Sequence, residues 1–161
     1  MIIREEGGWR FPELRGPEET GASVVPYTRD MILPSDLRDI AQARLDDADA
    51  LLQAGRFDGS VYVCGYAVEI ALKARICDCL RWPGYPDTNA EFKGYTSFRT
   101  HDLEVLLHLS GAETPIKAGY LPEWWIALDW NPDARYRAIG SASSQDASAM
   151  LSAAHTLIGA L

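Results

Sequence analysis

The chain has 161 residues, a formal net charge of −8 at pH 7 and a sequence pI of about 4.8. This length accommodates one domain with a hydrophobic core, and the acidic balance disfavours non-specific nucleic-acid binding, which depends on a positive field. No apolar run reaches the ~18 residues of a membrane span and no signal peptide opens the chain, so we expect a soluble, cytoplasmic protein.

Residues 1–33 differ in composition from the rest of the chain. They are rich in Gly, Pro and Glu, and their apolar residues follow no helical or alternating period. Such a segment has no continuous apolar face to bury, so we expect an extended arm, with a short hairpin as an option, that packs on the domain or on a partner chain. Residues 34–161 are then expected to form a single helical domain.

Apolar residues at three- and four-residue spacing predict a series of helices after the arm. The expected helices are 34–54, 58–80, 101–110, 121–130 and 144–161. A tight connection joins the first two into an antiparallel hairpin, and no stretch shows a convincing period of two. The predicted fold is therefore all-α, an up-and-down bundle of four or five helices.

Three local signals refine these helices. Thr100 is the expected N-cap of the third helix, and Ser143 with Asp146 forms the pattern of a capping box at the start of the last. Gly65 lies inside the second helix, where glycine costs about 1 kcal/mol relative to alanine. That cost indicates that a neighbouring helix approaches the backbone closely at this residue.

The second predicted helix is apolar on all sides, which is typical of a central, buried helix. Glu69 and Lys73 in its middle stand four residues apart in the order that favours a helical ion pair. Because a buried charge needs a partner, one interpretation is a structural pair, with Arg75 or Arg137 also bonded to Glu69. The other interpretation is a polar pocket in the bundle groove that accepts a nucleotide or phosphate.

The same helix carries all three cysteines, Cys64, Cys77 and Cys79. Cys77 and Cys79 point about 200° apart on a helix, so they cannot share a metal ion, and we expect buried, reduced thiols. The sequence also lacks the glycine-rich, zinc and nucleophile-elbow patterns that bind cofactors, metals or acyl groups. No metal or cofactor is therefore expected.

Several segments resemble the HEPN family (higher eukaryotes and prokaryotes nucleotide-binding). The hairpin Arg44–Ile76 contains AVEIALKA at Ala67–Ala74, which is similar to the AxExxLKA core of the family. THDL at Thr100–Leu103 resembles the start of the family's third helix. WNPDARYR at Trp130–Arg137 resembles the W-x-P-x-x-R-Y segment of one prokaryotic branch.

The resemblance implies a small α-helical domain that is often dimeric. Many members are metal-independent RNases of toxin–antitoxin and defence systems, in which the Arg of an R-x(4–6)-H motif polarises the phosphate and the His acts in acid–base catalysis. Other members bind nucleotides or partner proteins, commonly a small nucleotidyltransferase. For this chain the resemblance implies a homodimer, a nucleotide or RNA ligand and a nucleotidyltransferase-type partner.

The chain departs from the RNase pattern, because no arginine precedes a histidine at that spacing. Arg135 and Arg137 lie in the matching region, but alanine, serine and glycine follow them where the histidine would stand. We therefore expect a non-catalytic nucleotide-, RNA- or protein-binding module. The alternative is a divergent RNase that uses Arg135 or Arg137 with His101.

For the binding module, the candidate ligand-binding residues are Glu69, Lys73, Tyr66 and Trp130. A third hypothesis is a small-ligand pocket roofed by the long loop 81–100 and lined by Trp124 and Trp125. The aromatic residues of this region also suit base stacking, although aromatics in small bundles more often fill the core.

Overall fold

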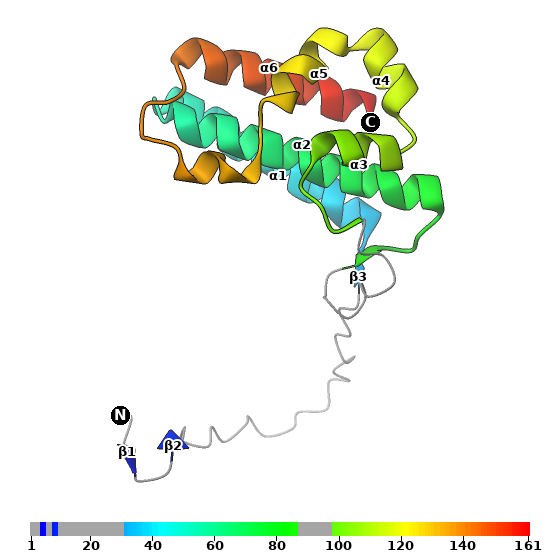
Figure 1. Ribbon diagram of the computed structural model, residues 1–161, viewed down its shortest axis with the longest axis horizontal. Coiled ribbons are helices and arrows are strands. Elements are labelled where there is room, and N and C mark those ends of the chain that lie inside the picture. The colour runs from blue at the N-terminus through cyan, green and yellow to red at the C-terminus, as the bar shows by residue number, and fades with distance from the viewer. Residues whose placement is uncertain (1–3, 6–7, 10–30, 87–97) are drawn as a thin grey trace, which may run out of the picture.

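The computed structural model describes residues 4–5, 8–9, 31–86 and 98–161 (Figure 1). Within the predicted arm, β1 (Arg4–Glu5) and β2 (Gly8–Trp9) pair antiparallel. The remainder of the arm up to residue 30, and residues 87–97 of the long loop, lie outside the described residues.

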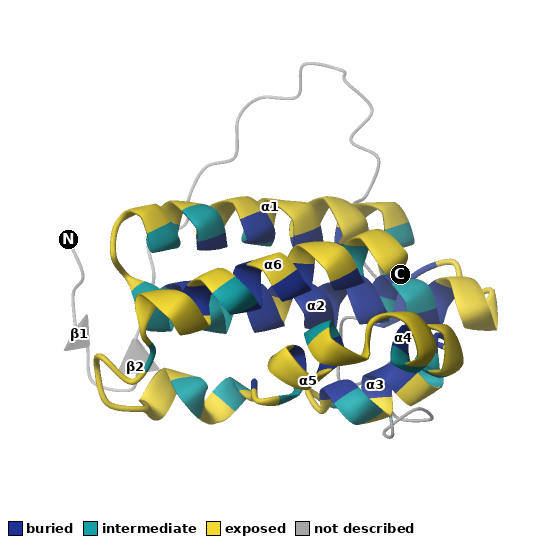
Figure 2. Cartoon of the chain, turned by 90° about the horizontal axis from the view of Figure 1, so that it is seen from above, coloured by how far each residue is buried: buried dark blue, intermediate teal, exposed yellow. Residues whose placement is uncertain are grey.

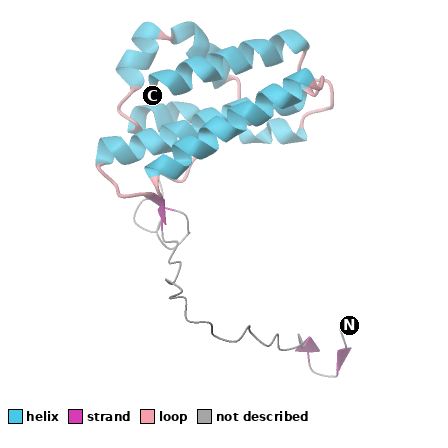
Figure 3. Cartoon of the chain, turned by 180° about the vertical axis from the view of Figure 1, so that it is seen from behind, coloured by secondary structure: helices cyan, strands magenta, loops and turns pink. Residues whose placement is uncertain are grey.

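The described chain is mostly helical, which confirms the predicted all-α class (Figure 3). The helices are α1 (Pro34–Gln53), α2 (Phe57–Leu80), α3 (Leu103–Leu109), α4 (Glu113–Gly119), α5 (Leu121–Leu128), the 3₁₀ helix η3 (Pro132–Tyr136) and α6 (Ser144–Ala160). Two short strands, β3 (Met31–Ile32) and β4 (Tyr85–Pro86), pair antiparallel beside the helices. None of the described helices is both long and apolar enough to cross a membrane.

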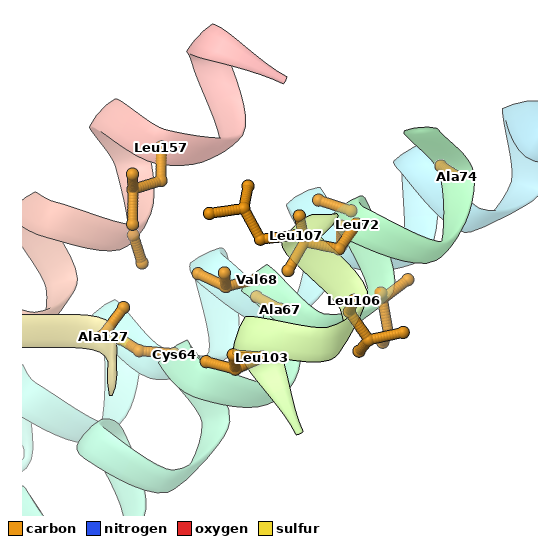
Figure 4. Packing of buried hydrophobic residues seen from close by; sticks show 14 of the residues in the cluster. Cys64, Ala67, Val68, Leu72, Ala74, Leu103, Leu106, Leu107, Ala127 and Leu157 are labelled. Carbon is orange, nitrogen blue, oxygen red and sulfur yellow. The ribbon is translucent and has the colours of Figure 1, made fainter. Parts of the chain in front are cut away.

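Helix α2 is the centre of the fold, as its uniformly apolar sequence predicts. Twelve of its 24 residues are buried, and α1, α3, α6 and η3 all pack against it (Figure 2). Figure 4 shows how side chains of α2 meet those of three other helices in the core. The contributing residues outside α2 include Leu103, Leu106 and Leu107 of α3, Ala127 of α5 and Leu157 of α6.

The close approach predicted at Gly65 is confirmed, although the neighbour is a side chain and not a helix backbone. A Cβ atom at Gly65 would lie 2.1 Å from Cγ of Trp130, so only glycine leaves space for the indole ring. The ring nitrogen of Trp130 donates a hydrogen bond to the carbonyl oxygen of Tyr62 at 3.0 Å. This hydrogen bond and the contact at Gly65 hold the segment after α5 against α2.

Two predictions about the third helix are wrong. The helix starts at Leu103, and its N-cap is Asp102, whose carboxylate accepts a hydrogen bond from the backbone N–H of Val105 at 3.2 Å. Thr100 acts one step earlier, because its hydroxyl oxygen accepts from the N–H of Asp102. The sequence interpretation also missed α4, a seven-residue helix too short to show a clear period.

The cysteines follow the prediction in part. Cys64 and Cys77 are buried, and burial raises the pKa of Cys64 to about 12 and that of Cys77 to about 11, so both stay protonated. Cys79 is exposed, so the expectation of burial is wrong for it. The residues on either side of it, Asp78 and Leu80, are exposed as well.

The predicted capping box at the start of α6 is confirmed, and a second carboxylate holds the loop before it. Asp58, at the start of α2, accepts hydrogen bonds from the backbone N–H groups of Gly140 (2.6 Å) and Ala142 (2.7 Å) and from the hydroxyl of Ser141 (2.9 Å). These bonds stabilise the charged carboxylate and lower the pKa of Asp58 below its usual 3.8.

This lowered pKa predicts an acid-dependent loss of stability. Because the pKa of Asp58 is lower in the folded than in the unfolded chain, its contribution is complete above about pH 4 and disappears as the pH falls through the folded value. The Asp58→Ala variant should therefore be less stable than wild type at pH 7, with a difference that shrinks below pH 4. Urea unfolding of both proteins between pH 2.5 and 7 measures this difference; a gap that stays constant over that range would contradict the assignment.

Candidate functional site

The candidate site is built around a carboxylate in the middle of the fold. Glu69 on α2 has no solvent-exposed surface, and its Oε1 atom accepts a hydrogen bond from Nζ of Lys73 at 2.5 Å. Nδ1 of His101 lies 2.9 Å from the same oxygen. The helical pair is thus present as predicted, but its third member is His101, and neither Arg75 nor Arg137 is paired with Glu69 among the described residues.

The second carboxylate oxygen of Glu69 lacks a hydrogen-bond donor among the described residues. Oε2 is shielded from solvent, and no described residue donates a hydrogen bond to it. A buried acceptor without a donor costs about 1–3 kcal/mol, and more when the group is charged. An N–H or O–H group of a ligand that reached Oε2 would recover that free energy.

Glu69 and Lys73 line a pocket of about 280 Å³ between α1, α2 and the segment that precedes α3. Its apolar wall comes from β3, α1, α2 and β4, namely Ile32, Leu37, Ile40, Ile70 and Pro86. Its polar wall consists of Tyr66, Glu69, Lys73, Tyr85, Arg99, Thr100 and His101. Three basic side chains therefore surround one carboxylate in an otherwise acidic protein.

Tyr85 connects this pocket to the loop that brings in Arg99 and His101. Its ring is buried, its hydroxyl donates to the carbonyl oxygen of Phe98 at 2.6 Å, and Nζ of Lys73 lies 5.5 Å from the ring centroid. Burial, with a further effect of the Glu69 charge, raises the pKa of Tyr85, so the phenol stays neutral. Tyr85 thus positions the basic segment over α2.

The sequence interpretation named Tyr85 only among the aromatic residues that suit base stacking, and not as a neighbour of Glu69 and Lys73. A usable signal was the WPGYP stretch, in which a Pro-Gly turn comes directly before two extended residues. At Gly84 a Cβ atom would lie 2.7 Å from Cβ of Met31, so the glycine lets β3 approach β4. This pairing places Tyr85 against α2.

The structure brings four of the predicted site residues into the same pocket and separates the other three from them. Tyr66, Glu69, Lys73 and His101 line the pocket together. Trp130 does not; it is 6% exposed, packs on Gly65 and uses its N–H for the Tyr62 carbonyl, so its contacts are those of a core residue.

The two candidate catalytic arginines lie away from His101. Arg137 is exposed and lines a different pocket, also of about 280 Å³, between α5, η3 and α6. The guanidinium carbon of Arg135 lies 4.8 Å from the ring centroid of Tyr136. His101 lines the Glu69 pocket and not that of Arg137, so the chain does not place the proposed acid–base and phosphate-binding groups in the same pocket.

The third hypothesis, a pocket under the long loop, gains no support from the tryptophans of α5. Trp124 is 1% exposed and belongs to the core, whereas its neighbour Trp125 is 62% exposed. Neither lines the Glu69 pocket, the pocket of Arg137 or the groove between α1, α2 and α6. Most of the predicted roof, 87–97, lies outside the described residues.

Comparison of the chain with protein-family models, with curated proteins and with solved structures gives no match. The resemblance to the HEPN family therefore stays a prediction from sequence.

Proposed function

We propose that the chain is a HEPN-like helical domain that works by binding and not by RNA cleavage, and that its ligand is a nucleotide held in the Glu69 pocket. The observation that carries the proposal is the buried carboxylate of Glu69, one oxygen of which has no hydrogen-bond donor among the described residues. It lies beside the basic groups of Lys73, Arg99 and His101. A purely structural ion pair needs neither the open oxygen nor the additional arginine.

A nucleotide supplies both kinds of group that this pocket lacks. Its phosphate suits Arg99, with Lys73 and His101 nearby, since charge-assisted hydrogen bonds to phosphate are among the stronger ones in proteins. An amino or hydroxyl group of its base or ribose suits Oε2 of Glu69. The ring of Tyr66, 40% exposed at the pocket wall, is available for stacking. The volume of about 280 Å³ lies near the lower end of small-ligand sites, which favours a mononucleotide.

The same proposal includes the partners that the family resemblance implies: a second copy of the chain, and a nucleotidyltransferase-type protein in a toxin–antitoxin or defence setting. The positions of Arg135 and Arg137, away from His101, favour this binding role over the divergent RNase. Size-exclusion chromatography with light scattering measures the oligomeric state directly.

The nucleotide proposal predicts saturable binding of adenosine 5′-monophosphate that depends on Glu69 and Arg99. Calorimetric titration should give a dissociation constant that rises roughly ten- to a hundredfold in Glu69→Gln and in Arg99→Gln, because each removes a charge-assisted hydrogen bond. Arg56→Gln, at an exposed arginine outside the pocket, is the matched control and should bind like wild type. Circular dichroism checks that each variant is folded.

Adenosine without phosphate should bind more weakly to wild type and should be insensitive to Arg99→Gln. Absence of AMP binding, or binding that survives both pocket substitutions, would contradict the proposal.

A binding role also predicts that the protein leaves RNA intact. Wild type at high concentration, incubated with a mixed RNA pool in EDTA, should give the same electrophoretic pattern as buffer alone. Cleavage that disappears in the Arg135→Ala/Arg137→Ala double variant would instead establish the divergent nuclease.

A further inference from the structure

A second pocket lies in the groove between α1, α2 and α6, apart from the Glu69 site. Its volume is about 420 Å³, against about 280 Å³ for the Glu69 pocket. The buried, apolar residues Ala41, Leu45 and Ala71 line it, together with the half-buried Ile158 and Leu161. Such a surface suits the hydrocarbon part of a small molecule.

Arg75 of α2 lines this groove and is half-buried. Its Nε atom is shielded from solvent and has no hydrogen-bond partner among the described residues. Six residues separate Arg75 from Glu69, so the two side chains leave α2 about 120° apart, towards different pockets. Among the described residues no acceptor bonds to this nitrogen, and the oxygen of a bound anion would supply one.

The remaining charged and titratable side chains of the groove are Arg38 and Asp39 from α1 and His155 from α6. Arg38 is already paired with Asp78, which lies outside the groove. Asp39 has no ion-pair partner among the described residues, and it is exposed at the rim. Arg75 is therefore the group on which an acidic ligand would be held.

We propose that this groove binds an organic anion with an apolar body. Its oxyanion head accepts hydrogen bonds from the guanidinium fork of Arg75, and its hydrocarbon part lies on Ala41, Leu45 and Ala71. A carboxylate and a phosphate monoester share this chemistry, because both present two oxygens that match the fork. The groove is a site separate from the nucleotide pocket and does not depend on that proposal.

The three histidines of the chain make both pockets visible in one NMR experiment. His155 lines the groove, His101 lines the Glu69 pocket, and the exposed His108, next to Glu113, lines neither. Ring ¹H–¹³C signals of the full chain are followed during titration with octanoate, octyl phosphate or uncharged octanol. We expect octanoate or octyl phosphate to shift His155 in a saturable manner, while His101 and His108 stay unchanged. The anion that saturates the His155 shift at the lower concentration identifies the preferred head group.

Arg75→Gln should raise the dissociation constant at least tenfold, whereas Arg56→Gln should leave it unchanged. Absence of a saturable His155 shift with either anion overturns the proposal. The proposal is also overturned if octanol binds as tightly as the anions, or if the anions bind Arg75→Gln as tightly as wild type. Either result would show an apolar surface on which the guanidinium has no role. Failure of AMP to shift His101 would count against the nucleotide proposal alone.

Discussion

Replacing Gly65 with alanine is expected to lower the free energy of unfolding by about 2–3 kcal/mol, the upper part of the range of about 1–3 kcal/mol for forcing an extra group into a packed core. The new methyl group would lie 2.1 Å from the indole of Trp130, so the ring has to leave its place on α2. Its hydrogen bond to the Tyr62 carbonyl would be lost with it. Urea unfolding followed by circular dichroism measures the change, and tryptophan fluorescence reports the displaced ring.

Gly59 provides the matched control on the same helix. A Cβ atom there meets Cδ1 and Cδ2 of Leu51 at 3.4 and 3.7 Å, which are ordinary contacts, and alanine is the better helix former by about 1 kcal/mol. Gly59→Ala should therefore leave stability unchanged or raise it. If both substitutions had the same effect, the loss at Gly65 would reflect the helix backbone and not the contact with Trp130.

The second large effect is expected at the buried ion pair. Lys73→Met removes the closest positive charge from Glu69, whose side chain is 1% exposed, and should lower the free energy of unfolding by about 3 kcal/mol. The loss arises because the carboxylate is left in the core, where the exposed His101 is its one remaining partner among the described residues. Equilibrium unfolding at pH 7 gives the value.

The double variant Glu69→Leu/Lys73→Met tests this explanation. With no carboxylate left to desolvate, apolar side chains of similar size should restore most of the stability lost in Lys73→Met. A double variant less stable than the single one would mean that the carboxylate itself holds the fold together. Nucleotide binding should be absent from the double variant even when it is stable, which separates the two roles of Glu69.

Local patterns in the sequence were sufficient to predict the long helices and the capping box of α6, which depend on residues close together in the chain. The spacing of apolar residues predicted α1, α2 and α6 nearly to their ends, and Ser143 and Asp146 form the expected capping box. Gly65 marked a close approach because glycine inside a helix is unfavourable unless something needs the space. For the helices and the capping box the physical cause lies within a few turns of the residue that reveals it, whereas the sequence does not show that Trp130 fills the space beside Gly65.

Features that depend on distant contacts were not predictable in the same way. A charge on α2 requires a partner, but no local pattern names His101, which is 32 residues away from Glu69 in sequence. The bonds from Asp58 to the loop at Gly140 span 82 residues. Nor does the sequence show that Nε of Arg75 has no acceptor among the described residues, because that depends on how α1 and α6 pack around it.

The pairing of β3 with β4 has a consequence for the order of folding. β3 directly precedes α1 and β4 follows α2, so their antiparallel register, Met31 with Pro86 and Ile32 with Tyr85, closes a ring around the whole helical hairpin. The strands are too short to pair on their own. The entropic cost of bringing them together falls once α1 and α2 have docked, because the helices already hold the two ends close to each other. The ring therefore closes late, and its backbone amides should exchange with solvent hydrogen sooner than those in the middle of α2.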